Sequence, residues 1–267
     1  MSVTMLMNSK LKLALLQTEL IWENPKANHV HFEQLLKFVP DDSDLIVLPE
    51  MFTTGFSMNS INLAESNNGI SVGWMKNVAA IKNASVIGSI IIKDEGQYYN
   101  RLYWVFPDGT FEQYDKRHLF RMANEDKHFA QGMKRLVADY KGWKICPLIC
   151  YDLRFPVWSR NDCQYDCVIY IANWPAPRVD AWSALLRARA IENQCFSIGV
   201  NRIGMDGSGI KYSGGSAAFS PRGQLLTSFQ DDMEKVEILE IEKNELIDMR
   251  RKFPVHLDQD HFEVKGI

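Results

Sequence analysis

The order of apolar segments along the chain predicts a layered protein of the α/β or α+β class. Short apolar runs alternate with stretches whose apolar residues recur at helical spacing, and turn signals join other runs into hairpins. Of the 267 residues, 46% are hydrophobic and 24% are charged. That composition supplies enough apolar side chain for a large core and excludes a disordered chain.

The first third of the chain predicts the order β-α-β-α-β. Strands are expected at residues 11–16, 44–48 and 84–92, because these runs are short and apolar. Between them, residues 24–38 and 71–81 carry apolar side chains at helical spacing and are expected to be helices. The second strand ends at Pro-Glu, so that a carboxylate follows a buried segment directly.

The next segment changes character. Strand-like runs at 98–106 and 110–114 flank Pro-Asp-Gly at 107–109, which predicts a hairpin. Residues 116–132 mix charges, His and Phe without a clear period. They are expected to form an ordered loop, and such loops often carry functional residues on a rigid scaffold.

The second half returns to alternation. Strands are expected at 143–149, 167–172 and 195–201, and a helix is expected to begin at 157–160. Residues 180–194, rich in Ala, Leu and Arg, form the clearest helical pattern of the chain.

The last segments predict mainly strands. The glycine-dense stretch 204–215 is interpreted as a surface loop, because it lies between two predicted strands and opens no helix. Strands are expected at 216–220, 224–229 and 235–241, followed by a helix near 242–251.

No flexible linker, low-complexity tract or repeat interrupts this order, which favours one domain over residues 1–267. Its core is expected to span about 10–245, with a C-terminal tail at 246–267.

Charge and hydropathy exclude several classes of partner. The 30 Lys and Arg against 33 Asp and Glu leave a net charge of −3, which offers no basic field to a nucleic acid. No run approaches the roughly 18 apolar residues of a membrane span, and the first residues lack the basic region of a signal peptide. Five cysteines, four of them within 146–167, do not fit a secreted disulfide scaffold. We therefore expect a cytoplasmic protein.

The first candidate catalytic residue is Glu50, at the end of DLIVLPE. A carboxylate at the mouth of a buried strand is partly desolvated, which suits a general base. The alternative is an ordinary solvated glutamate in a turn, and position alone favours that alternative.

The second candidate is Lys116 in QYDKRHLF, just after the predicted hairpin and among aromatic residues. A lysine there could stabilise an oxyanion or lower the pKa of a neighbouring thiol. Considered alone, it is more often a surface charge with a partly buried stem.

The third candidate is Cys150 in KICPLICYDLRFP, where an apolar strand runs into a polar turn. Such a junction is typical of a nucleophile elbow, which lifts the side chain out of the sheet and frees the next backbone N–H for an oxyanion. The alternative is a buried, inert cysteine. The polar residues Asp152 and Arg154 that follow favour a functional role.

A four-cysteine metal site is the competing interpretation of Cys146-x₃-Cys150 and Cys163-x₃-Cys167. It is rejected because the first pair lies within a strand-like run, which would separate its sulfur atoms by roughly 13 Å at ~3.3 Å per residue. No GxGxxG after a strand and no Walker loop is present. We expect neither a metal nor a cofactor.

Taken together, PE at Glu50, DKRHLF at Lys116 and CYDLRFP at Cys150 resemble the motifs of the nitrilase, or carbon–nitrogen hydrolase, superfamily. The resemblance covers nearly the whole chain. It implies an α+β fold, a four-layer α-β-β-α sandwich, and a Glu-Lys-Cys catalytic triad on these three residues. It also implies a second glutamate near the lysine, which the segment EDKHFAQG supplies as Glu125.

The segment NWPAPRVDAWSALLRARAIENQ at 173–194, followed by GVNRIGMDGSG, is similar to the bacterial ω-amidase branch of this superfamily. The resemblance implies a thiol-dependent amidohydrolase that releases ammonia from the ω-amide of a small dicarboxylate, such as 2-oxoglutaramate or succinamate. The sequence resembles less closely the aliphatic nitrilases, the N-carbamoyl amino acid hydrolases and the NAD synthetase glutaminase domains.

The implied chemistry gives each residue a role. Glu50 would take the thiol proton while Cys150 attacks the amide carbon, and Lys116 with the backbone N–H of Tyr151 would hold the oxyanion. The protonated glutamate would then release ammonia, leaving a thioester for water to hydrolyse. Glu125 would orient the lysine and the leaving amine.

The distal carboxylate of such a substrate is expected to meet a cation, with Arg178 the first candidate and Arg154 the second. Trp174 and Phe52 are expected to wall the pocket. The family resemblance further implies a homodimer, to which the helix at 180–194 could contribute.

Two alternatives stay open. Another amide, carbamoyl or nitrile hydrolase could use the same triad, and a non-catalytic binding protein could retain the fold. The complete Glu-Lys-Cys set argues against the second.

Overall fold

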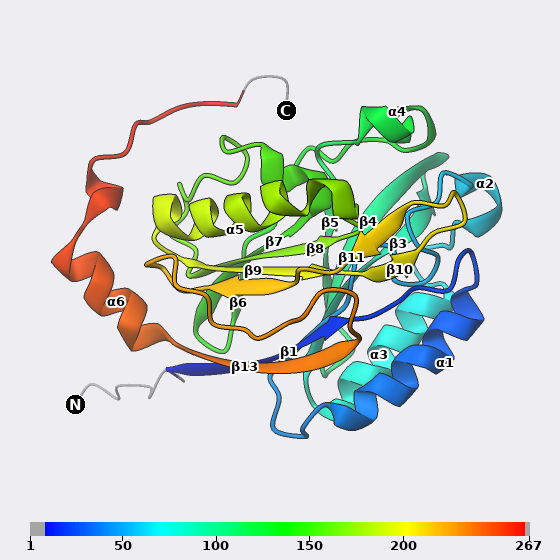
Figure 1. Ribbon diagram of the computed structural model, residues 1–267, viewed down its shortest axis with the longest axis horizontal. Helices are drawn as coiled ribbons and strands as arrows, with labels where there is room; N and C mark the ends of the chain where they lie inside the picture. Colours follow the sequence, from blue (N-terminus) through cyan, green and yellow to red (C-terminus); the bar gives the residue numbers. More distant parts are fainter. Residues whose placement is uncertain (1–8, 265–267) are drawn as a thin grey trace.

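Two β-sheets lie face to face between outer helices in the computed structural model, which describes residues 9–264. Figure 1 shows α5 (Val179–Asn193) on one side of the sheets, and α1 (Pro25–Leu35) with α3 (Ile70–Lys82) on the other. This is the four-layer α-β-β-α sandwich of the α+β class that the sequence predicts. Two ranges lie outside the described residues. They are residues 1–8, where no signal peptide is expected, and residues 265–267, the end of the predicted tail.

The first sheet has a parallel centre with antiparallel strands on both sides. β1, β2 and β3 pair in parallel, β13 joins β1 antiparallel, and β4 and β5 continue the other edge antiparallel. In spatial order the strands are β13 (Lys235–Glu242), β1 (Lys10–Gln17), β2 (Leu45–Val47), β3 (Ser85–Asp94), β4 (Gln97–Val105) and β5 (Phe111–Asp115).

The second sheet repeats this plan with three central parallel strands. Its spatial order is β12 (Ala217–Phe219), β9 (Phe196–Asn201), β8 (Cys167–Ala172), β7 (Trp143–Ile149) and β6 (Ala138–Tyr140). A separate hairpin joins β10 (Ile203–Met205) to β11 (Lys211–Ser213). The short helices are α2 (Ser60–Leu63), α4 (Glu125–His128) and the 3-10 turns η1 (Leu36–Phe38), η2 (Arg121–Ala123), η3 (Cys150–Arg154), η4 (Ala176–Arg178) and η5 (Val255–Leu257).

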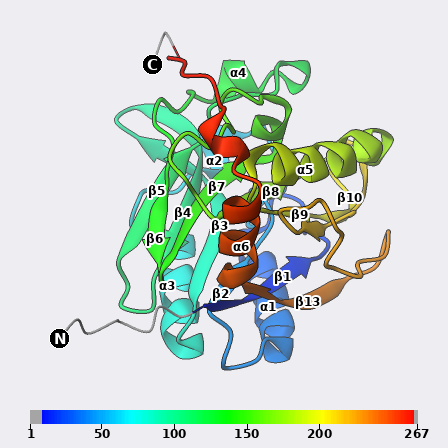
Figure 2. The ribbon, with the colours of Figure 1, turned by 90° about the vertical axis from the view of Figure 1, so that its left-hand side faces the viewer.

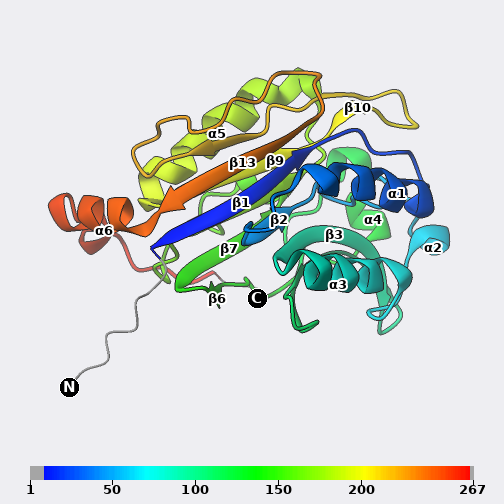
Figure 3. The same cartoon turned by 90° about the horizontal axis from the view of Figure 1, so that it is seen from below.

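Side-chain alternation along β1 explains the two cores. Leu13 and Leu15 point into the core shared by the two sheets, while Ala14 and Leu16 pack beneath α1 and α3. Figure 3 shows those two helices side by side across this face of the first sheet. Burying each such leucine contributes about 1.5–3 kcal/mol, so a strand that is apolar on both faces can only sit inside the sandwich.

Side chains of α5 pack directly on the second sheet at Gly199. A side chain added at Gly199 on β9 would meet the side chains of Trp182 and Leu186 of α5 at 2.5 Å. The absence of a side chain at Gly199 leaves room for these two side chains. Figure 2 shows α6 (Lys243–Lys252) on the outside of the sandwich.

Most predicted elements are confirmed within one or two residues, but the helix expected to begin at 157–160 is wrong. That segment forms turns only. The guanidinium of Arg135 donates to the backbone carbonyls of Trp158 and Arg160, at 2.9 Å and 2.8 Å, and so takes the carbonyls that a helix would need.

The strand expected at 224–229 is also wrong. Only Leu225 forms an isolated bridge there, to Phe219. The hydroxyl of Thr227 accepts the N–H of Ala218 at 3.1 Å, in place of the backbone carbonyl that a regular ladder would supply.

The stretch 204–215 is not a simple surface loop, because it contains the β10–β11 hairpin. Asp206 organises its tip, where one carboxylate oxygen accepts the N–H groups of Ser208 and Ile210 at 2.8 Å and 2.9 Å. Over residues 9–264, no helix is long and apolar enough to cross a membrane.

Candidate active site

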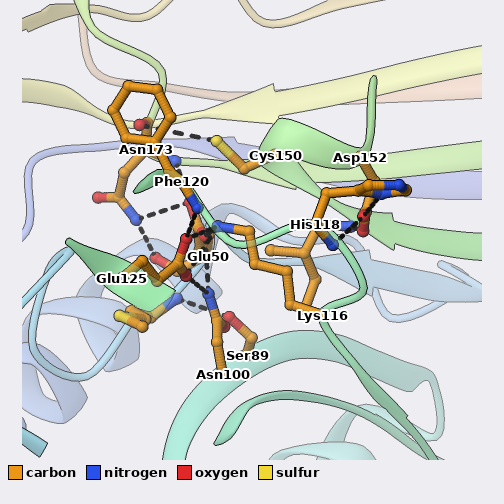
Figure 4. Close-up of polar contacts among 12 residues, drawn as sticks. Glu50, Ser89, Asn100, Lys116, His118, Phe120, Glu125, Cys150, Asp152 and Asn173 are labelled. Carbon is orange, nitrogen blue, oxygen red and sulfur yellow. Dashed lines mark hydrogen bonds and ion pairs between the residues drawn. The ribbon is translucent and has the colours of Figure 1, made fainter. Parts of the chain in front are cut away.

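Glu50, Lys116 and Cys150 come from different strands and meet in one place. Glu50 follows β2, Lys116 follows β5 and Cys150 follows β7. Figure 4 shows the three side chains converging between the two sheets, together with Glu125 from α4. All four are buried, and the thiol residue retains 8% exposure.

The ammonium of Lys116 lies between two carboxylates. Its Nζ donates to Oε1 of Glu50 at 2.8 Å, and to Oε1 and Oε2 of Glu125 at 2.9 Å and 3.0 Å. Burial by itself lowers the pKa of Lys116, but the charges of Glu125 and Glu50 overcome that effect and raise the pKa above its ordinary value. The lysine is therefore a permanent cation in the site.

Glu125 shapes the loop that carries the lysine. Its Oε2 accepts the backbone N–H of Phe120 at 2.6 Å, which closes the segment between β5 and α4 around the carboxylate. Burial raises the pKa of Glu125, Lys116 lowers it, and the nearby charge of Glu50 raises it further. This residue stabilises the loop as well as the charge of the lysine.

Asn100, on β4, was not identified from the sequence. Its Nδ2 donates to Oε1 of Glu50 at 2.8 Å and to Oε1 of Glu125 at 3.3 Å. The only available signal was an amide in the middle of a strand rich in aromatic residues. Because its amide bridges both carboxylates, Asn100 fixes their separation.

Cys150 lies at a sharp turn directly after β7, the position expected for a nucleophile elbow. It begins the 3-10 turn η3 with φ +44°, a left-handed conformation that L residues seldom adopt. Its Sγ donates to the backbone carbonyl of Asn173 at 3.8 Å. Burial raises the pKa of this thiol well above its usual range, and the charge of Glu50 adds to that effect while Lys116 opposes it. Cys150 therefore rests as a thiol, and removing its proton requires a base.

Asp152 holds the elbow in place. Its Oδ2 accepts the N–H of Ile149 at 3.0 Å and the hydroxyl of Tyr114 at 2.8 Å. Its Oδ1 accepts the backbone N–H of His118 at 3.0 Å. The carboxylate thus joins the turn after β7 to the end of β5 and fixes Cys150 relative to Lys116.

A pocket opens above these groups. Its empty space, counted with the open mouth, is about 480 Å³. The lining residues are Phe56, Lys116, Phe120, Ala123, Cys150, Tyr151, Arg154, Asn173, Trp174, Pro175, Arg178, Ile210 and Tyr212.

Two cations stand on the walls of this pocket. The guanidinium of Arg154 lies 4.9 Å from the ring of Trp174, and that of Arg178 lies 5.3 Å from the ring of Phe120. Aromatic faces hold both cations without neutralising them. The pocket can therefore bind an anionic group beside the nucleophile.

Four of the five predicted substrate contacts line the pocket, namely Tyr151, Trp174, Arg178 and Arg154. The prediction for Phe52 is wrong. Its ring packs 5.6 Å from the rings of Phe32 and Trp74, in the core beneath α1 and α3. Phe56, Ile210 and Tyr212 take part instead, and none of them was identified from the sequence.

The other cysteines lie apart from the chemistry. Cys146, Cys167 and Cys195 are buried, and burial raises the pKa of each. Cys163 is half-buried beside Arg135. Within the described part of the chain, no group of three or more His, Cys, Asp or Glu side chains could hold a metal ion.

Known proteins match this chain over almost its full length. The carbon–nitrogen hydrolase family model matches residues 12–251. Omega-amidase YafV of Escherichia coli K12 is 44% identical over 254 residues, which are 95% of this chain and 98% of that protein. The 2-oxoglutaramate amidase of Bacillus subtilis strain 168 is 31% identical, covering 93% of this chain and 97% of that one.

A solved structure extends the likeness to three dimensions. XC1258 from Xanthomonas campestris, described as a CN-hydrolase superfamily protein with an arsenic adduct in its active site, has a TM-score of 0.93 and 42% sequence identity. The match covers 96% of this chain and 99% of that one. The chain therefore belongs to the carbon–nitrogen hydrolase family.

Proposed function

We propose that this protein is an ω-amidase, an amidohydrolase that releases ammonia from the ω-amide of a small dicarboxylate such as 2-oxoglutaramate or succinamate. The observation that carries the proposal is a buried Glu50–Lys116 pair beside the Cys150 thiol, below a pocket whose walls hold Arg154 and Arg178. The likeness to proteins named omega-amidase and 2-oxoglutaramate amidase, at 44% and 31% identity, supports the same substrate class.

The first step forms a thioester. Glu50 takes the thiol proton as the sulfur of Cys150 attacks the amide carbon, so the S–H bond breaks while S–C and O–H bonds form. The glutamate then gives this proton to the amide nitrogen, and the C–N bond breaks to release ammonia. A base is required because the pKa of the buried thiol is raised.

The oxyanion of the tetrahedral intermediate is held by two donors. Lys116 supplies an ammonium that its carboxylate partners keep charged. The backbone N–H of Tyr151 lies in the first turn of η3, where N–H groups have no partner within the helix. Preorganised donors of this kind stabilise developing charge without any reorganisation.

The second step hydrolyses the thioester. Glu50, ionised again after ammonia leaves, takes a proton from water as the water oxygen attacks the acyl carbon. The C–S bond then breaks to release the acid, and Glu50 returns the proton to sulfur, which restores the thiol. Glu125 keeps the lysine in position through both steps, because it binds that ammonium through both carboxylate oxygens. No metal or cofactor enters this scheme.

We assign the distal carboxylate of the substrate to Arg178 first and to Arg154 second. Both guanidinium groups line the pocket, and both retain exposed surface. The free thiol that this chemistry needs also fits the cytoplasmic location proposed from the sequence, since that compartment keeps cysteines reduced.

The test is ammonia release from 2-oxoglutaramate and succinamate, compared with aliphatic nitriles and N-carbamoyl amino acids. The ω-amides should be hydrolysed fastest, and Cys150→Ala should lower the rate at least about a thousandfold. Mass spectrometry of the substrate-treated enzyme should show an acyl adduct on Cys150. Activity on nitriles or carbamoyl compounds alone would assign another hydrolase to this triad, and an unaffected Cys150→Ala variant would favour a binding protein.

A further inference from the structure

Asn173 contacts both the base and the nucleophile of the proposed mechanism. It directly follows β8 and is only 3% exposed. Its backbone N–H donates to Oε2 of Glu50 at 2.8 Å, and its backbone carbonyl accepts from Sγ of Cys150 at 3.8 Å. Figure 4 shows this residue beside Glu50 and Cys150, with dashed lines to both.

The side chain of Asn173 adds a third contact, and its orientation is fixed. Nδ2 donates to the backbone carbonyl of Glu50 at 2.6 Å and lies 3.5 Å from Oε2 of the same residue. Both partners are acceptors, so the amide cannot be turned the other way. The buried Oδ1 accepts no hydrogen bond from residues 9–264.

The acceptor positions of the Glu50 carboxylate show which of its two oxygens can take a proton. An ionised carboxylate offers about four lone-pair positions, two on each oxygen. On Glu50, Lys116 and Asn100 fill both positions of Oε1, at 2.8 Å each. The N–H of Asn173 fills one position of Oε2 at 2.8 Å, and Nδ2 of Asn173 reaches the other only at 3.5 Å, so the most weakly held position, the one open to a proton, lies on Oε2.

We propose that Asn173 is a positioning residue that selects Oε2 of Glu50 as the proton acceptor and holds the thiol of Cys150 facing it. The proposal rests on the function proposed above, because it assigns the atom that receives the thiol proton. As the S–H bond breaks, the new O–H bond forms on Oε2, beside the carbonyl to which the thiol was hydrogen-bonded.

The backbone of Trp174, the residue after Asn173, is also held by hydrogen bonds, which keeps Asn173 in place. The N–H of Trp174 donates to Oδ1 of Asn201 at 2.7 Å, and Nδ2 of Asn201 donates back to the carbonyl of Trp174 at 2.9 Å. Asn201 is fully buried on β9. The segment is thus held on one side by the second sheet and on the other by Glu50.

Two variants test the side-chain contact. Asn173→Ala removes the donor to the Glu50 carbonyl, and we expect kcat to fall about 10–100-fold while KM changes less than about threefold. Asn173→Asp replaces that donor by a carboxylate facing Glu50. The loss of kcat in this variant should be larger at pH 8 and smaller at pH 6, because the introduced carboxyl can donate a hydrogen bond only when it is protonated.

The ratio of variant to wild-type kcat/KM should therefore rise for Asn173→Asp as the pH falls, and stay flat for Asn173→Ala. The matched control is Asn161→Asp, since Asn161 is also buried and its Nδ2 donates to two backbone carbonyls outside the site. That control should lower the melting temperature without a pH-dependent activity ratio. Wild-type kcat in Asn173→Ala, or a flat ratio in Asn173→Asp, would overturn the proposal.

Alkylation of Cys150 by iodoacetamide, followed by mass spectrometry without substrate, separates this inference from the proposed function. Asn173→Ala should be alkylated about tenfold more slowly than wild type at pH 7, because Glu50 no longer receives the proton efficiently. If the wild type hydrolysed no ω-amide and this difference persisted, only the substrate assignment would fail. Equal alkylation rates would contradict the role of Asn173 whatever the substrate.

Discussion

At the scale of single residues, the site is defined by one cation between two buried carboxylates. Lys116 pairs with Glu50 and Glu125, and none of the three side chains reaches solvent. Two negative charges and one positive charge leave the ionised cluster with one negative charge in a medium where charge is costly. The raised pKa of Glu125 is the consequence, because burial and the charge of Glu50 together outweigh the attraction of the lysine.

Glu125→Gln should therefore cost the fold less stability at pH 8 than at pH 5, and it should impair the reaction. A folded-state pKa raised above 4.5 means that protonation of Glu125 favours the folded state at low pH, and this contribution is lost as the pH rises through the raised value. The melting temperature of the variant relative to wild type should be higher at pH 8 than at pH 5. Ammonia release should fall at least about tenfold.

Differential scanning fluorimetry at the two pH values measures this effect, and Glu112→Gln, at an exposed position on β5, is the control. A larger loss of stability for Glu125→Gln at pH 8 than at pH 5 would show that the ionised carboxylate stabilises the fold.

At the scale of elements, the β10–β11 hairpin completes the pocket. The hydroxyl of Tyr212 donates to Oδ2 of Asp206 at 2.9 Å, and the guanidinium of Arg202 lies 4.8 Å from the Tyr212 ring. Burial lowers the pKa of this arginine, whose hydrogen bonds go to backbone carbonyls. Together these contacts hold Ile210 and Tyr212 against the pocket.

Asp206→Ala should loosen this hairpin. The change removes the acceptor of two backbone N–H groups and of the Tyr212 hydroxyl. KM for the ω-amide should rise roughly tenfold, because one pocket wall is lost, while kcat stays within about threefold, because the reacting groups lie on other elements. Steady-state kinetics beside the exposed control Asp231→Ala measures the difference. A fall in kcat at unchanged KM would place the hairpin in the chemical step instead.

At the scale of the whole molecule, the two sheets share one core. Side chains of β1 and β2 pack with those of β7, β8 and β9 in a single cluster. Glu50, Lys116 and Cys150 follow strands of both sheets, so neither half carries the candidate site alone. This arrangement supports the single domain that we propose for the chain. We also propose that the protein forms a homodimer through the outward face of α5.

Light scattering after size-exclusion chromatography should give twice the 30.7 kDa mass of one chain. Ile191, on α5, is 49% exposed, so Ile191→Glu should shift the protein toward the monomer by placing a charge in the proposed interface. Ile81→Glu is the matched control on α3, where the isoleucine is 81% exposed. A monomeric wild type, or dissociation caused by the control alone, would contradict this interface.

Local patterns predicted most strands and helices because buried strands are short continuous apolar runs, while helices repeat apolar residues at helical spacing. They failed where a side chain replaced a backbone partner. Arg135 takes the carbonyls of the helix expected at 157–160, and Thr227 supplies the acceptor within the strand expected at 224–229. These hydrogen bonds form only when the chain folds, so no short stretch of sequence can show them.

The sequence by itself determined the order of elements and the strand ends at which Glu50, Lys116 and Cys150 stand, because hydrophobic periodicity and turn residues are local properties. The tertiary structure decided which side chains meet. It brought Asn173 to Glu50 across 123 positions of the chain and turned Phe52 away from the pocket into the core under α1. Such contacts depend on how two sheets stack and on which face a side chain leaves, and a shift of one residue reverses that face.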